Sequence, residues 1–329
     1  MRRNRQKSWR SLLSNDRETV RQLSPKSQKE KFILPYNHML IEDVKTKIMP
    51  SRHYDKQKET SVIQLCPPDT SAQKNISLVL SENRYPSQNL EDEISYFIKE
   101  CASIIMNEGQ AIYEIVNYKN KTASESSFLK LEPVPRGIIK FFLGRALQIL
   151  PKLEELEGKE PCFKRITKDK LVIFRMPKPY RTNYKELQSQ LDMLGKEGTQ
   201  NLYTKSLEEI DKHKKLNLNQ KANISKYSKL FALSATNLIG WNARDFRSNH
   251  LQEYFTLVRF LRFERFKLAL RNSILNTINN NLNRLLPNST YNGRLEFRHL
   301  PTDEDIEKAE KYLREGNKKF NDIFKLFQV

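Results

Sequence analysis

Glycine is scarce in this sequence, at nine of 329 residues. Loops that bind phosphate groups through backbone amides need closely spaced glycines, and neither GxGxxG nor GxxxxGK[ST] occurs. The GxSxG turn of one large hydrolase class is missing as well. These absences exclude the common nucleotide-binding loops, so we expect no enzyme activity and no cofactor. An active site assembled from distant residues stays open as an alternative.

Cysteine and histidine are also few. The odd number of cysteines and the lack of any CxxC pair argue against a disulfide framework or a structural zinc and fit a reducing compartment. The histidines show neither HxxxH nor HExxH spacing, so we expect no metal site. The residues concerned are Cys66, Cys101, Cys162, His38, His53, His213, His250 and His299.

Long apolar runs are lacking too. No stretch approaches the roughly 18 apolar residues of a membrane span. The opening "MRRNRQKSWRSLLSNDRE" has basic residues but no apolar signal-peptide core. We therefore expect a soluble protein, made in a cytoplasm, with no membrane partner.

Positive charge is what the sequence has in excess. There are 58 Lys and Arg against 39 Asp and Glu, a net charge of +19. A field of this sign attracts polyanions, so nucleic acid is the first partner to consider and an anionic membrane surface the second. A generally solvated basic surface is the alternative.

The chain divides by composition into four regions. Its 38% hydrophobic content is enough for a core, and the order of elements predicts an α+β fold. We expect a basic, partly disordered N-terminal arm at 1–60, in which only the piece "FILPYNHML" can anchor the arm to the rest of the protein. An α+β domain is expected at 61–180. A helical segment at 181–240 and a region at 241–329 with a long helix, a strand and C-terminal helices follow.

A helix that turns directly into a strand is the clearest local signal. "LEDEISYFIKECASIIM" has helical apolar spacing, Asn89 caps its start, and Gly109 can close its end in a left-handed conformation. The next residues, "AIYEIVNY", alternate with period two and predict a strand. Further strands are predicted in "FLKLEPVP", "GRALQIL" and "DKLVIFRMPKP".

The longest predicted element runs from a cap at Asn249 to Pro287, about 36 residues without interior Gly or Pro and about 54 Å if continuous. Arg259, Arg262 and Arg265 recur along it at a spacing of three. Such bases can line a groove for phosphates or pair with acids of a neighbouring subunit. The interleaved phenylalanines favour packing over base stacking, and apolar residues on more than one side favour oligomer contacts.

The C-terminal helix begins with acidic residues. Thr302 is the predicted cap, and Asp303, Glu304 and Asp305 follow in the first turn. This helix is either a solvated surface helix or a partner for the basic face of the long helix.

The order of these elements resembles that of tailed-phage portal proteins. In that family a helix runs into a glycine and a strand, the next strand carries an L-x-P turn, and a later strand precedes a proline turn. The matching residues are Gly109, Ala111, Tyr113, Glu114 and Ile115, then Leu131, Glu132 and Pro133, then Ile166, Asp169, Leu171, Val172 and Phe174. The family's G-x-S-P and N-E-x-R signatures are absent, and the chain is short for the family.

The resemblance implies a wing of a helix plus a small mixed sheet, a helical stem near 180–230 and one very long helix. It implies a homo-oligomeric ring, typically a dodecamer, in the virion, which passes double-stranded DNA and contacts terminase, capsid and head-tail connector proteins. The DNA-facing residues would be Lys205, Lys212, Lys214 and Lys215, with Arg259, Arg262 and Arg265. The alternative is a basic nucleic-acid-binding protein of a mobile element, acting as a monomer or dimer.

Overall fold

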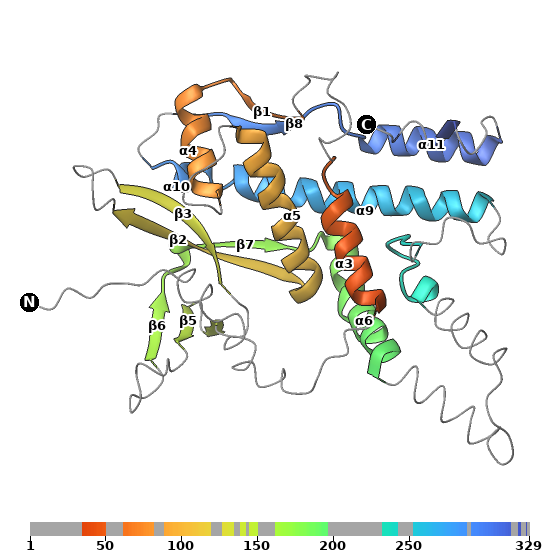
Figure 1. Ribbon diagram of the computed structural model, residues 1–329, viewed down its shortest axis with the longest axis horizontal. Coiled ribbons are helices and arrows are strands. Elements are labelled where there is room, and N and C mark those ends of the chain that lie inside the picture. Colours follow the sequence, from red (N-terminus) through yellow and green to blue (C-terminus); the bar gives the residue numbers. More distant parts are fainter. Residues whose placement is uncertain are drawn as a thin grey trace, which may run out of the picture.

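The computed structural model describes residues 35–50, 62–81, 89–119, 127–134, 139–142, 145–150, 162–196, 232–242, 253–287, 291–316, 322–323 and 327. The predicted arm before residue 35 and the four lysines Lys205, Lys212, Lys214 and Lys215 lie outside these residues. Within them the fold is α+β, as predicted, with helices packed against small sheets (Figure 1).

The central sheet has the order β3-β2-β7. Its strands are β2 (Gln110–Lys119), β3 (Ser127–Pro133) and β7 (Leu171–Arg175). All described strand pairs are antiparallel, so the expected mixed sheet is wrong. Ala111 and Tyr113 belong to the main hydrophobic core, and Ile112 belongs to a second cluster on the opposite face.

Helix α5 (Leu90–Glu108) leads into this sheet as predicted. The Asn89 side chain accepts a hydrogen bond from the Glu91 amide and caps the start. Gly109 has φ +78°, and its N–H donates to the Ile105 carbonyl at 2.7 Å. A residue with a side chain is disfavoured at this φ, so glycine allows the chain to leave the helix and begin β2 at once.

A second sheet, of order β4-β5-β6, covers the other face of the central sheet. Its strands are β4 (Ile139–Phe142), β5 (Arg145–Leu150) and β6 (Cys162–Ile166), and the 3-10 turn Lys168–Lys170 leads on to β7. Ala146 of β5 packs in one cluster with Ile112 and Leu171 of the central sheet. Of these three strands, only β5 was predicted.

Helix α9 (Glu253–Asn279) crosses the core and is 27 residues, about 40 Å, long (Figure 1). It ends before the predicted Pro287, and the short α10 (Leu282–Leu285) follows. At the break, the Asn281 side chain donates to the Thr277 carbonyl at 2.7 Å. Asparagine side chains compete in this way with helical backbone hydrogen bonds, so the NNN run stops the helix.

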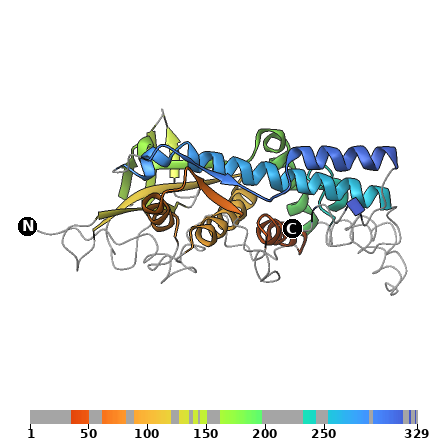
Figure 2. The ribbon, with the colours of Figure 1, turned by 90° about the horizontal axis from the view of Figure 1, so that it is seen from above.

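The apolar sides of α9 are buried within this chain. One side packs in the main core, and Leu257 and Leu261 form another cluster with Ala309 of α11 (Asp303–Glu315), which lies alongside α9 (Figure 2). The buried apolar residues of α9 and of the start of α10 include Leu257, Leu261, Leu268, Leu275, Ile278 and Leu282. The argument for oligomer contacts from an unburied long helix is therefore wrong.

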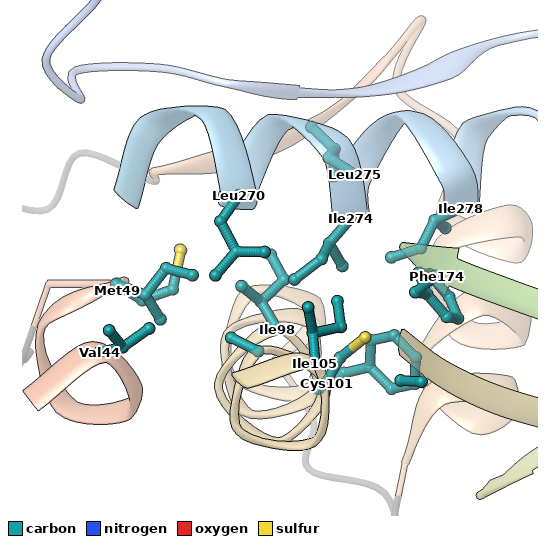
Figure 3. Packing of buried hydrophobic residues seen from close by; sticks show 14 of the residues in the cluster. Val44, Met49, Ile98, Cys101, Ile105, Phe174, Leu270, Ile274, Leu275 and Ile278 are labelled. Carbon is teal, nitrogen blue, oxygen red and sulfur yellow. The ribbon is translucent and has the colours of Figure 1, made fainter. Parts of the chain in front are cut away.

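Helix α3 (Pro35–Lys47) belongs to the folded core. Leu40, Val44, Ile48 and Met49 are each at most 2% exposed. Figure 3 shows Val44 and Met49 beside Leu270 of α9, with side chains of α5 and β7 completing the cluster. The boundary predicted at residue 60 is therefore too late, because residues 35–50 carry core side chains at helical spacing.

Two strands far apart in the sequence share a sheet. Strand β1 (Ile63–Cys66) pairs with β8 (Arg294–Phe297), so that Ile63 lies opposite Phe297. Helix α4 (Thr70–Leu80) follows β1 and is capped by Asp69. Segments assigned to the second and fourth predicted regions thus form one core and are not separate units.

Helix α6 (Lys178–Lys196) confirms that the chain is helical after Pro179. Tyr180 makes an edge-to-face contact with Phe266 of α9, with centroids 4.8 Å apart. The Gln188 side chain donates to the carbonyls of Met106 and Asn107 at the end of α5. These contacts fix one face of α6 to the core and leave the other exposed.

Candidate nucleic-acid-binding surface

Arg259, a predicted DNA-facing residue, is buried and only 1% exposed. Its Nη1 donates to the Leu233 carbonyl at 2.9 Å and its Nε to Asn242 Oδ1 at 3.0 Å. Its Nη2 donates to Thr236 Oγ1 at 2.9 Å and to the Trp241 carbonyl. One guanidinium therefore anchors residues 232–242 onto α9.

The burial of Arg259 argues against the DNA-facing role. Desolvation, with a smaller contribution from Arg262, lowers the pKa of Arg259 to about 10, so it stays charged at neutral pH. Its protein hydrogen bonds compensate for the water it has lost. The network continues to α3, because Trp241 Nε1 donates to Asp43 Oδ2 at 2.8 Å.

Arg262 and Arg265 are engaged at the surface. Arg262 is exposed, and its Nη1 donates to Asn237 Oδ1 at 2.8 Å. Arg265 lies 3.0 Å from the Glu310 carboxylate of α11. The acidic helix therefore meets the basic face of the long helix within one chain, which confirms the second of the two alternatives for that helix.

The space between α9 and α11 is an open groove of about 550 Å³. Its lining carries as many acids as bases: Glu307, Glu310, Glu315, Arg265, Lys311 and Arg314. A lining with no net charge gives little attraction for a polyanion. This groove is therefore a weak candidate for contact with nucleic acid.

The phenylalanines of α9 mainly pack in the protein. Phe263 and Phe266 are 8% and 0% exposed, and Phe260 contacts Phe327 edge to face. Phe255 alone among them is strongly exposed, with the Arg259 guanidinium 5.7 Å from its ring centroid. The prediction that packing outweighs base stacking is confirmed.

Two further bases on α9 are buried. Lys267 lies 2.8 Å from Glu264, and burial lowers its pKa although Glu264 opposes the shift. Arg271 donates to the carbonyls of Ile48 and Pro301, both at 3.3 Å, and burial lowers its pKa to about 10. Arg271 thus joins α9 to the end of α3 and to the turn before α11, and neither base is available to a ligand in solution.

The residues of the portal-like motif occupy structural positions. The Tyr113 ring lies 5.1 Å from that of Phe97 and 5.4 Å from that of Phe174, measured between centroids. Pro133 ends β3 opposite Tyr113. Gly109 closes α5, as described above. We assign these residues to the fold.

Glu114 is also buried, and it faces a second acid. It is the cross-strand partner of Glu132, and the two are 5% and 1% exposed. The Tyr118 hydroxyl donates to Glu132 Oε1. The described residues contain no group of three or more His, Cys, Asp or Glu side chains placed to hold a metal ion.

A basic face on α6 was not among the predicted sites. We call Lys178, Arg181 and Lys185 the α6 basic face. At about 100° per residue they lie within about 60° of one another around the helix axis, and all three are exposed. The buried stripe lies on the other side of the helix and comprises Tyr180, Tyr184, Leu187 and Leu191. In the sequence, the signal for this basic face was the spacing of three and four between Lys178, Arg181 and Lys185. It was easy to miss because lysine is abundant throughout the chain.

None of the described helices is long and apolar enough to cross a membrane. Comparison of the sequence with models of known protein families and with curated proteins finds no match. The α+β class thus comes from the structure, and the likeness to portal proteins remains a resemblance in sequence order.

Proposed function

We propose that this chain is a portal protein of a tailed phage, a subunit of a ring through which double-stranded DNA is packaged and ejected. The observation that carries the proposal is the order of elements around Gly109. There α5 turns directly into β2, and β3 and β7 complete the sheet. The helical α6, the long α9 and the closing pair of β8 and α11 then follow in the order of the resemblance.

The proposed task is mechanical and electrostatic. The ring would sit in the virion, join the capsid and connector proteins and receive the terminase motor. DNA that slides through a channel needs contacts that are numerous, weak and independent of sequence. A chain with no recognised catalytic motif suits such a task, whereas a net charge of +19 is more basic than we expect for a channel through which DNA slides.

Ring formation tests the proposal. We expect the purified full-length chain to form a closed ring with a fixed number of subunits, seen by electron microscopy and with a matching mass by light scattering. Both measurements are made at two salt concentrations, because basic chains also associate through contaminating nucleic acid. A nuclease-treated protein that stays monomeric at high concentration and moderate salt would contradict the proposal.

A second candidate function is a basic nucleic-acid-binding protein that acts as a monomer or dimer. The charge of the chain and the exposed α6 basic face favour it. It predicts tight binding to free DNA or RNA that falls steeply with salt. Filter binding at two salt concentrations separates the two functions, since a portal ring is expected to hold free DNA only weakly.

A further inference from the structure

We infer that the α6 basic face, Lys178, Arg181 and Lys185, contacts the phosphate backbone of double-stranded DNA. The inference rests on the proposed function for the choice of DNA as the polyanion. The position of the site rests on the structure alone. It differs from the sites predicted on α9, which are buried or paired inside the chain.

The three side chains have no acidic partner among the described residues, whereas Arg265 lies 3.0 Å from Glu310. They span eight residues of helix, about 10 Å along the axis. One strand of B-DNA presents about three phosphates over that distance. The face therefore matches a short length of one backbone.

The start of α6 carries bases where the starts of α5 and α11 carry acids. Three acids occupy the first turn of α5, and three occupy that of α11. The first turn of α6 contains no acid, and Lys178 opens it. Bases near the positive end of a helix dipole cost stability, but they add to its attraction for an anion. A local conflict of this kind is expected where a residue serves binding.

The chemistry of the exposed side favours duplex DNA over other polyanions. Tyr180 and Tyr184, the aromatic residues of α6, are 8% and 5% exposed, so they offer no platform for stacking unpaired bases. The side chains exposed beside the bases, such as Thr182 and Ser189, are polar. Protein partners and membrane surfaces usually engage an apolar centre, which this face lacks.

The test compares two triple variants of the full-length chain. K178Q/R181Q/K185Q neutralises the α6 basic face. K308Q/K311Q/R314Q removes the same charge from exposed bases at similar spacing on α11, where acids such as Glu307 and Glu315 stand among them. Binding of a 30-base-pair duplex of arbitrary sequence is measured from 50 to 200 mM salt, and the mass of each protein is measured in parallel.

We expect the α6 variant to bind at least tenfold more weakly at 50 mM salt, with a salt slope smaller by about 3, since each phosphate contact contributes about 0.9. The α11 variant should stay within about threefold of the wild type if long-range charge is a minor effect. Equal losses in both variants, or none in the α6 variant, would overturn the inference. Stronger dependence on the α6 bases for single-stranded DNA or for phosphatidylserine vesicles than for the duplex would also overturn it.

The mass measurement keeps the two proposals apart. A ring whose duplex binding does not depend on α6 leaves the proposed function standing and removes this inference. A monomer or dimer whose duplex binding does depend on α6 removes the portal proposal and keeps the inference.

Discussion

The Nη1 atom of Arg259 lies 2.9 Å from the carbonyl oxygen of Leu233, 26 residues earlier in the chain. The same guanidinium reaches Thr236, Trp241 and Asn242. Arg259, which the sequence suggests is a surface base, thus anchors residues 232–242 to α9. Its contribution should appear in stability rather than in affinity for DNA.

Replacing Arg259 with methionine should destabilise the protein by about 2–4 kcal/mol, because several buried hydrogen-bonding groups lose their partner at once. Arg262→Met is the matched control on the same helix, since Arg262 is exposed and, among the residues that the structure describes, bonds to Asn237 alone. It should cost less than about 1 kcal/mol. Urea unfolding measures both, and similar costs for the two variants would contradict the anchoring role.

Alanine at Gly240 should be far more harmful than alanine at Gly109. The two glycines have almost the same left-handed backbone, with φ of +80° and +78°. A Cβ at Gly240 would lie 2.2 Å from the Arg259 carbonyl oxygen, whereas one at Gly109 would make an ordinary 3.6 Å contact with the Tyr184 ring. We expect about 1–2 kcal/mol for Gly109→Ala from backbone strain and more than about 3 kcal/mol for Gly240→Ala.

Thermal and urea unfolding of these two variants provide the measurement. Because the backbone strain is nearly the same in both, the difference between them isolates the close approach of residue 240 to α9. Equal destabilisation would show that the turn can move away from Arg259.

Local signals made much of this fold predictable. Asn89, the acids after it and Gly109 lie within or next to one helix, and the structure confirms each of their roles. The alternation of β2 and the capping box at Thr302 are signals of the same short range. Short-range patterns are set by backbone geometry, which the sequence carries directly.

What could not be predicted depends on distant partners. The burial of Arg259 requires residues 232–242 to fold back onto α9, and the pairing of Ile63 with Phe297 joins residues far apart in the sequence. The core position of α3 depends on its contacts with α5 and α6. The α6 basic face becomes visible only when Arg265 and its neighbours on α9 are found paired or buried.

The ion pair between Arg265 and Glu310 should contribute modestly to holding α11 on α9. Their side chains are 36% and 27% exposed, so a double-mutant cycle with alanine should give a coupling of about 0.5–1 kcal/mol. Lys311 and Glu315, 3.9 Å apart and with side chains 70% and 42% exposed, form the control pair within α11. Their coupling should be smaller, and both should weaken in 1 M salt. A larger coupling for the control pair would contradict this ranking.

The capping box of α11 should make stability depend on acid pH. Hydrogen bonds from the Thr302 backbone and side chain lower the pKa of Asp305 below its ordinary value. The folded state therefore binds this proton less readily than the unfolded state. The stabilisation is fully present above the unfolded pKa, near 4, and is lost as the pH falls through the lower folded value.

Asp305→Asn should accordingly be less stable than the wild type at pH 7, and the gap should close as the pH falls below about 4. Asp303→Asn, in the same turn, is the control. It also removes an acid near the helix start, but the capping box is formed by Thr302 and Asp305 and does not involve Asp303. Unfolding followed by circular dichroism from pH 7 to pH 3 provides the test. A gap for Asp305→Asn that does not change with pH would refute the charge-based explanation.

Removing the bases at the start of α6 should raise the stability of the protein and lower its affinity for duplex DNA. Replacing Lys178 and Arg181 with glutamine removes two positive charges near the positive end of the helix dipole, so the folded protein should gain a few tenths of a kcal/mol. If the α6 basic face binds phosphates, the same variant should lose affinity for duplex DNA.

Lys308 and Lys311 of α11, replaced in the same way, provide the control, because they lie beyond the first turn of their helix. Unfolding and duplex binding at low salt measure both effects. A variant that is less stable than the wild type would show that these bases serve the fold, whereas greater stability with weaker binding is what a surface retained for DNA requires.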